Sequence, residues 1–168
     1  MEKRVSLAWS TGIDFTATSE DGVSVELGGA ESPGTFRPAA MLLVALGGCT
    51  GMDAISILTK KRIAVSSYRV EVSGIQKDEH PKPYTSIIVE HVVEGTSIDD
   101  ASVARAVELS ARKYCAVGAT IAQGETTIEH RTRIVDENGE RTCECLVIGP
   151  RGQGLAGAEA REAVGTSA

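Results

Sequence analysis

The chain has 168 residues, of which 42% are hydrophobic, and a formal net charge of −6. This length suffices for one domain with a substantial core, whereas two independent domains would each be small. The acidic balance, without a cluster of Lys and Arg, argues against a nucleic-acid surface, because binding phosphates needs an excess of positive charge on one face. We therefore expect one domain and no nucleic-acid partner.

Two kinds of targeting segment are also not expected. The longest apolar run, residues 41–46, is far shorter than the roughly 20 residues of a membrane-spanning helix, and the N-terminus lacks the apolar stretch of a secretory signal. We therefore expect no membrane partner and a cytoplasmic location. Thiols stay reduced there, so the four cysteines are interpreted as reactive, buried or metal-binding rather than as a disulfide framework.

Three short strands are predicted at the N-terminus. Apolar and polar residues alternate over 5–9, 13–17 and 23–27, and turns that contain glycine separate the runs. A period of two with such breaks is typical of an antiparallel meander. The loop that follows, residues 28–37, is rich in glycine, serine and proline, and it leads to a helix.

A long helix is predicted over residues 38–61, and its first residue, a proline, suits a position where no N–H is needed. Residues 41–46 are apolar all round, so we expect this part of the helix to be buried on every side. Gly47 and Gly48 each disfavour the helix by about 1 kcal/mol relative to alanine. They indicate close approach of another backbone or of a substrate beside Cys49.

Two strands, a second helix and a last strand are predicted in the rest of the domain. Residues 68–73 and 87–93 alternate as strands do. A capping box at 97–100 precedes a helical repeat of apolar positions over 103–114. The alternation over 126–135 predicts the last strand.

We expect the domain to occupy residues 1–135 and residues 136–168 to form a C-terminal extension. This extension is rich in Gly, Ala and Glu and has few large apolar groups, so it is expected to be partly mobile. It contains Cys143 and Cys145, but one C-x-C pair offers only two of the four ligands of a tetrahedral zinc site. The alternative is that the two thiols share one face of a late strand.

Two cysteines outside the extension are candidates for chemistry. Cys49 follows the apolar run of the first helix and Cys115 ends the second helix. Either could be an inert core residue, since cysteine is among the most buried residue types. A nucleophilic thiolate is the alternative for Cys49, and the guanidinium of Arg37 would favour the thiolate if it reached the sulfur.

The three histidines are weaker candidates. His80 lies between an acidic segment and Pro81, where a turn residue is more typical than a base or a ligand. His91 and His130 fall within predicted strands, and we interpret both as satisfied or solvated side chains.

The sequence resembles the OsmC/Ohr family over about residues 5–135. The resemblance rests on residues 37–53, the His80-Pro81 pair and residues 113–120, which contain two separate cysteine motifs in the expected order. It implies an α+β fold of two-layer antiparallel sheets with long buried central helices. It also implies an intertwined homodimer.

The resemblance further implies a thiol peroxidase that reduces organic hydroperoxides to alcohols. Cys49 would be the peroxidatic residue that forms a sulfenic acid, and Cys115 would be the resolving residue that closes a disulfide. Arg37 would be the active-site arginine. An external dithiol would reopen the disulfide, and no cofactor or metal is implied.

The chain departs from the family pattern at one acidic position. Family peroxidases carry a glutamate nine or ten residues before the peroxidatic cysteine, where this chain has Ala39 and Ala40. Asp53 and Glu31 are the candidate substitutes as partner of Arg37. The departure leaves two alternatives: a redox sensor or small hydrophobic ligand-binding protein without turnover, and an interaction protein with inert cysteines.

Overall fold

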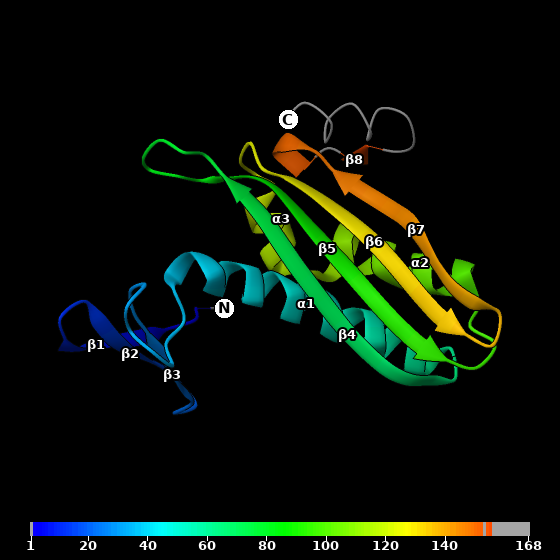
Figure 1. Cartoon of the computed structure of the whole chain (residues 1–168), viewed down its shortest axis with the longest axis horizontal. Coiled ribbons are helices and arrows are strands. Elements are labelled where there is room, and N and C mark those ends of the chain that lie inside the picture. The colour runs from blue at the N-terminus through cyan, green and yellow to red at the C-terminus, as the bar shows by residue number, and fades with distance from the viewer. Residues whose placement is uncertain (1, 153, 156–168) are drawn as a thin grey trace. The chain divides into compact units, whose positions relative to one another are not determined.

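The computed structural model describes residues 2–152 and 154–155. The chain forms two compact units, residues 1–44 and 45–168, and the boundary falls within the long helix α1 (Pro38–Lys60) (Figure 1). We describe each unit by itself.

The first unit contains a three-stranded antiparallel sheet. Its strands β1 (Val5–Thr11), β2 (Asp14–Ser19) and β3 (Ser24–Leu27) pair in chain order. The predicted meander is therefore confirmed. Gly12 and Gly22, in the two turns, have φ values of 52° and 80°, which glycine adopts without the steric cost that a side chain would add.

Helix α1 follows the predicted range closely, but its surroundings differ from the expectation. Leu42 and Val44 are 40% and 47% exposed, so the apolar half of the helix is not buried on every side within one chain. Helix α1 is also long and apolar enough to cross a membrane by length and composition, contrary to our expectation that no segment would be. One such helix is weak evidence, because a core helix of a soluble protein passes the same test.

The second unit is built on a five-stranded sheet in the order β4-β5-β6-β7-β8. Its strands are β4 (Val65–Gln76), β5 (Tyr84–Gly95), β6 (Thr127–Asp136), β7 (Gly139–Ile148) and β8 (Gly154–Leu155). Strands β5 and β6 are parallel, whereas the other neighbours are antiparallel. This pair departs from the antiparallel prediction because the chain between the two strands is a helical crossover, as parallel pairing requires.

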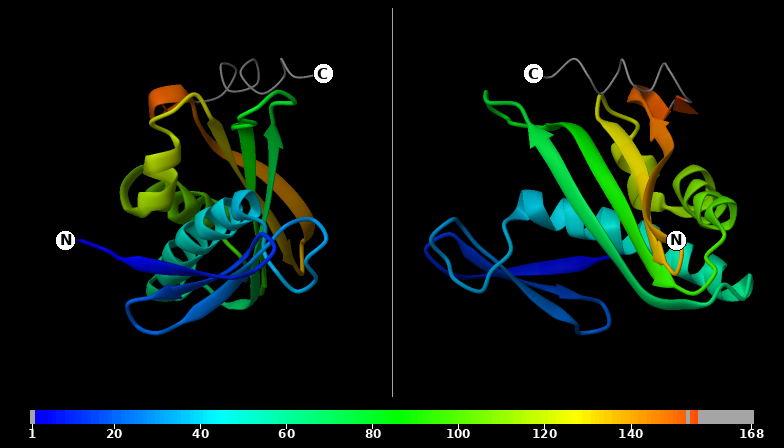
Figure 2. Two further views of the ribbon diagram at one scale, coloured as in Figure 1. Left: turned by 90° about the vertical axis from the view of Figure 1, so that its left-hand side faces the viewer. Right: turned by 45° about the vertical axis from the view of Figure 1, so that its right-hand side comes forward.

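The crossover contains α2 (Asp100–Leu109), the π-helical turn η1 (Ser110–Tyr114) and α3 (Ala116–Ile121). Helix α2 begins after Asp99, whose carboxylate accepts the N–H of Ser102 at 2.9 Å, rather than after the predicted cap at residue 97. The crossover helices and the second-unit part of α1 lie against the same face of the sheet (Figure 2).

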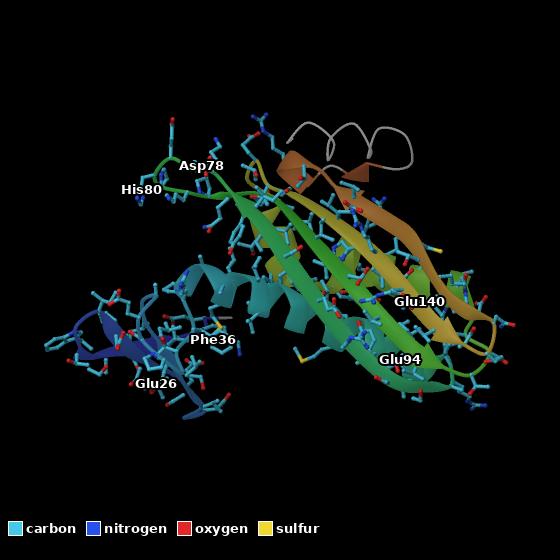
Figure 3. The ribbon with its side chains drawn as sticks, viewed as in Figure 1. Glu26, Phe36, Asp78, His80, Glu94 and Glu140 are labelled. Carbon is cyan, nitrogen blue, oxygen red and sulfur yellow. The ribbon has the colours of Figure 1, made fainter. Side chains whose placement is uncertain are left out.

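The two faces of this sheet differ in character. The face toward the helices holds an apolar cluster, which comprises Leu58, Val93, Ile98, Val103, Ala106 and Ile134. On the opposite face, Arg69 forms ion pairs with Glu71 and Glu94, and Arg133 forms one with Glu90 (Figure 3). Alternation along the strands produces this division.

Strand β7 lies in the part of the chain that we expected to be a C-terminal extension. It pairs with β6 along its length, and Leu146, Val147 and Ile148 are buried. These three consecutive apolar residues follow the charged stretch 140–144. We missed the strand because the expectation rested on the average composition of the last 33 residues, in which these three residues carry little weight. Residues 156–168, the rest of the expected extension, lie outside the described residues.

Candidate functional site

Cys115 lies where the crossover changes from one helix to the next. Its N–H donates to the carbonyl of Ser110 at 2.9 Å, the bond that closes the π-helical turn. Cys115 itself is extended, and its Sγ accepts the N–H of Gly118 at 3.1 Å, so the thiol caps α3. A Cβ at position 118 would lie 3.3 Å from this sulfur. Glycine at this position therefore leaves room for the thiol.

Cys49 lies on α1, half-buried, two residues from each of Gly47 and Gly51, which lie against β4. A Cβ at Gly47 would lie 2.8 Å from Val72 Cγ2, and one at Gly51 would lie 3.0 Å from Val70 Cγ2. A close approach beside Cys49 is thus found at Gly47, but it is made by the side chain of Val72 and not by the backbone or substrate that we expected. The neighbouring Gly48 has no atom within 4 Å of its would-be Cβ, so the same reason does not apply to it.

The fold brings the two thiols together although they are 66 residues apart in sequence. The Cys115 side chain is 2% exposed and lies near enough to Cys49 to interact with it. Burial, and then the neighbouring Cys49, raise the pKa of Cys115 to about 12, against the opposing effect of the Gly118 N–H. Cys115 is therefore a protonated thiol at neutral pH, and Cys49 is the more accessible of the two sulfurs.

Asp53 is the carboxylate of this site. It lies one helical turn after Cys49 and accepts a hydrogen bond from the hydroxyl of Ser110 at 2.9 Å. Its negative charge adds to the rise in the pKa of Cys115. Of the two candidate substitutes for the family glutamate, Asp53 is thus engaged with Ser110, and Glu31 is exposed in the loop before α1.

Arg37 belongs to the first unit, whereas both cysteines belong to the second. It lines a cavity of about 540 Å³, whose other lining side chains include Leu7, Ile13, Phe15 and Leu27. This cavity is apolar apart from the guanidinium. The expected contact between Arg37 and the peroxidatic sulfur stays a prediction.

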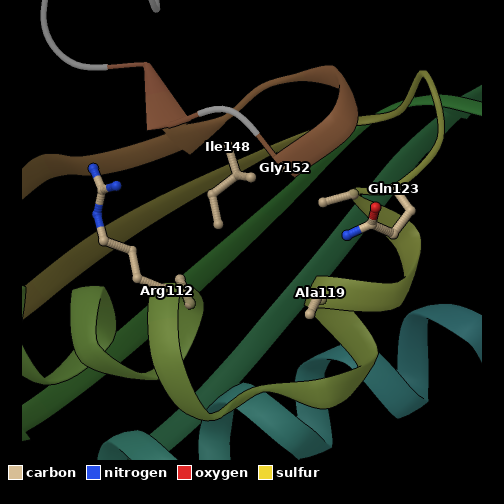
Figure 4. Close-up of a pocket in the computed structure, with 8 residues that line it drawn as sticks. Arg112, Ala119, Gln123, Ile148 and Gly152 are labelled. Atoms are coloured by element: carbon tan, nitrogen blue, oxygen red, sulfur yellow. The ribbon is translucent and has the colours of Figure 1, made fainter.

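A smaller cavity of about 210 Å³ in the second unit is lined by residues of η1, α3 and β7. Arg112 and Gln123 supply its polar groups and stand on opposite sides of it, with Ala119 between them along the chain (Figure 4). The motif residue Gly118 is shared between this cavity and the contact with Cys115.

The histidines occupy two unlike environments. His80 is exposed at the turn between β4 and β5, where a turn residue was the favoured interpretation (Figure 3). His91 and His130 are buried and their rings stack with centroids 5.8 Å apart. Tyr68 hydroxyl lies 2.6 Å from His91 Nδ1.

The buried pair is neutral and incompletely hydrogen-bonded. Burial lowers the pKa of His91 to about 4 and that of His130 to about 3. Within the described residues, His91 Nε2 and His130 Nδ1 have no hydrogen-bond partner. Our interpretation of these two side chains as satisfied or solvated was wrong for these two nitrogens, whereas His91 Nδ1 has a partner in Tyr68. Alternation with Val89, Val93 and Ile134 could have placed both rings on the apolar face.

No group of three or more His, Cys, Asp or Glu side chains that could hold a metal is found in the described part of the chain. Cys143 is exposed on β7, opposite Thr132 of β6. The side chain of Cys145 lies outside the described residues, so the interpretation of the C-x-C pair stays open.

Comparison with known proteins identifies relatives that match this chain over nearly their whole length. A family model described as OsmC-like protein matches residues 28–131. Protein YhfA of Escherichia coli strain K12 is 36% identical over 135 residues, which cover 80% of this chain and 98% of YhfA.

Two solved structures extend the comparison to the fold. A hypothetical protein from Aquifex aeolicus VF5 is 28% identical with a TM-score of 0.73, and the match covers 82% of this chain and 98% of that one. A Legionella pneumophila protein described as an organic hydroperoxide resistance protein OsmC has a TM-score of 0.59 at 11% identity, covering 80% of this chain and 96% of that one. At that identity the likeness shows the fold alone.

Proposed function

Because the chain belongs to the OsmC-like protein family, we propose that it is a thiol-dependent peroxidase that reduces organic hydroperoxides to alcohols. The observation that carries this proposal is the proximity of the Cys49 and Cys115 side chains in one unit of the fold. The Legionella protein, described as an organic hydroperoxide resistance protein, shares this fold.

The chemistry needs only the two sulfurs and an external reductant. The Cys49 thiolate attacks the distal oxygen of the hydroperoxide, the O–O bond breaks, and the alcohol leaves after taking up a proton. Cys49 then carries a sulfenic acid. Cys115 attacks that sulfur, the S–O bond breaks, and water leaves as the disulfide forms. A cytoplasmic dithiol reduces the disulfide and restores both thiols.

The unequal burial of the two sulfurs supports this division of roles. Cys49 is half-buried and open to a substrate, whereas Cys115 is buried and protonated, as suits a group that reacts only with its neighbour. Arg37 is proposed to favour the Cys49 thiolate. Ala39 and Ala40 stand where the family carries its glutamate, so we expect turnover to be slower than in relatives that retain this acid.

Proteins of this family are typically homodimers, and we propose the same assembly here. Large apolar side chains are exposed on the first unit and on α1 of a single chain. They include Val5 at 70%, Leu7 at 54%, Trp9 at 66%, Leu42 at 40%, Val44 at 47% and Met52 at 70% exposure. Exposed apolar surface of this kind marks an interaction site in a soluble protein.

The peroxidase is tested by following the loss of cumene hydroperoxide in the presence of dithiothreitol. We expect multiple turnovers for the wild type and background rates for Cys49→Ser. Cys115→Ser should consume one equivalent per chain and then slow strongly, because the sulfenic acid is no longer resolved. Cys143→Ser, which removes an exposed cysteine, is the matched control and should behave as the wild type. Equal rates in the wild type and Cys49→Ser would contradict the proposal.

The alternative is a protein that binds a small hydrophobic ligand or senses oxidants without turnover. The apolar cavity of about 540 Å³ that Arg37 lines favours this function, as does the lack of the family glutamate. It predicts that oxidation stops after one equivalent of hydroperoxide even with excess dithiol. Repeated turnover in the same assay would exclude it.

A further inference from the structure

Ser110 contacts both of the segments that carry the paired cysteines. It is fully buried at the junction of α2 and η1. Its hydroxyl donates to the carboxylate of Asp53 at 2.9 Å and lies 3.4 Å from the carbonyl oxygen of Thr50. Thr50 and Asp53 are one and four residues after Cys49, so this contact engages the turn of α1 that follows the thiol.

The main chain of the same residue holds the other cysteine. The Ser110 carbonyl accepts the N–H of Cys115 at 2.9 Å. Side chain and main chain of Ser110 thus link the Cys49 turn to the Cys115 backbone through two short hydrogen bonds. Hydrogen bonds to carboxylates are among the stronger ones in a protein.

The direction of the Ser110 hydroxyl is unusual for a serine in a helix. Serine within a helix commonly bonds back to a carbonyl of its own preceding turn, as Thr50 does to Leu46 at 3.0 Å. Ser110 bonds instead across to the neighbouring helix. Packing alone would be served by alanine at this fully buried position, so the hydroxyl is explained by the link that it makes.

We propose that Ser110 is a positioning residue that holds the Cys115 sulfur in line with the Cys49 sulfur for disulfide closure. This inference rests on the proposed peroxidase function and adds the residue that sets the rate of its second step. In that step the Cys115 sulfur bonds to the sulfenic sulfur of Cys49 and the S–O bond breaks. The hydroxide leaves with the Cys115 proton as water. The narrow range of Cβ distances that a disulfide tolerates makes this step sensitive to a small displacement.

The proposal predicts a split between the two steps of the reaction. Ser110→Ala is expected to change the first step little, because Cys49 remains on α1 and no atom of its side chain is lost. The variant should consume the first equivalent of cumene hydroperoxide within about twofold of the wild-type rate, whereas the disulfide should form at least tenfold more slowly. Dimedone, which traps sulfenic acids, should therefore label Cys49 more heavily than in the wild type.

The measurement is a single-turnover reaction quenched at intervals and analysed by mass spectrometry for disulfide and dimedone adduct. Thr120→Ala is the matched control, because it removes a hydroxyl from α3 whose bond, to Ala116 O at 2.8 Å, stays within one helix. It should close the disulfide at the wild-type rate. Asp53→Asn keeps an acceptor for Ser110 without the charge and should give an intermediate rate, and it serves as the test variant if Ser110→Ala does not fold.

A second measurement separates this inference from the peroxidase itself. The disulfide is equilibrated with mixtures of reduced and oxidised dithiothreitol, which requires no peroxide chemistry. Ser110→Ala should lower the equilibrium constant for disulfide formation at least tenfold. Failure of the wild type to react with hydroperoxide, with this shift intact, would overturn the peroxidase and leave the positioning role. Wild-type closure rates and equilibrium constants in Ser110→Ala would overturn the role of Ser110 alone.

Discussion

At the scale of single residues, the candidate site depends on small side chains that leave room for sulfur. Gly118 donates its N–H to Cys115 Sγ, and the absence of a side chain keeps this approach open. The cysteine is further held by the carbonyl of Ser110. The position of the buried thiol therefore depends on two backbone groups, the Gly118 N–H and the Ser110 carbonyl, and on the absence of a side chain at Gly118.

Gly118→Ala is expected to displace the Cys115 sulfur. The added Cβ would meet Sγ at 3.3 Å, which is tighter than ordinary contact, so we expect a loss of about 1–2 kcal/mol in the free energy of unfolding. Disulfide formation with oxidised dithiothreitol should also slow. Urea unfolding and mass spectrometry measure the two effects. Gly124→Ala, whose Cβ would be 3.5 Å from its nearest neighbour, is the control, and equal effects in both variants would refute the prediction.

His91 and His130 should make the fold sensitive to mild acid. Their pKa values are lowered from the usual 6.5 to about 4 and about 3, so the unfolded chain takes up protons before the folded chain does. Stability should therefore fall as the pH drops from about 6.5 to about 4, by on the order of 3 kcal/mol for His91 alone.

Urea unfolding at a series of pH values, at one protein concentration, measures this loss. His130→Leu should reduce the slope of stability against pH between 4 and 6.5, because one buried imidazole is gone. His80→Leu removes an exposed histidine and should leave the slope as in the wild type. An unchanged slope in His130→Leu would show that the buried pair is not the source.

At the scale of elements, two consecutive glycines of α1 play unlike parts. Gly47 is buried against β4, where a Cβ would lie 2.8 Å from Val72 Cγ2, whereas Gly48 is exposed. The helix can approach the sheet closely only on the side of Gly47 and Gly51, four residues apart and therefore on one face.

Gly47→Ala and Gly48→Ala should consequently shift stability in opposite directions. The Cβ at position 47 would be 2.8 Å from Val72 Cγ2, and we expect a net loss of about 1–2 kcal/mol. Alanine at position 48 meets nothing within 4 Å and should add up to about 1 kcal/mol through helix propensity. Urea unfolding of the two variants decides this. Similar losses in both would mean that a partner chain packs against Gly48.

At the scale of the whole molecule, a single chain exposes several large apolar side chains to solvent, and an assembly would cover them. Leu42 and Val44 project from α1, and the first unit exposes Val5, Leu7 and Trp9. A helix that is apolar on nearly all sides is normally enclosed by protein. The proposed homodimer supplies that enclosure.

Val44→Glu should therefore weaken the dimer. Burying a carboxylate in an apolar interface costs several kcal/mol, so we expect the dissociation constant to rise at least about a hundredfold. Sedimentation velocity at several concentrations measures this change. Thr59→Glu places the same charge at an exposed position near the end of α1 and should leave the dimer intact. A wild-type protein that is monomeric at all concentrations would contradict the assembly.

The sequence alone was sufficient for most of the local elements, and the roles of Cys49 and Cys115 stay a prediction. The period of apolar residues predicted the three-stranded meander, α1 and the strands β4 to β6, because burial of one face imposes a period of two or 3.6 on the chain. It could not show that β5 and β6 run parallel or that β7 completes the sheet, since strand order depends on contacts between distant segments.

Only the tertiary structure brought Cys49 near Cys115 and linked Asp53, one turn after Cys49, to Ser110. Those contacts join residues about 60 positions apart. The local sequence around a serine on an amphipathic helix does not show whether its hydroxyl will bond to another helix or within its own. The same holds for the stacked histidines: alternation places each on the apolar face, but their mutual contact exists only in the folded sheet. Local patterns record which face is buried, whereas the site depends on which buried groups meet.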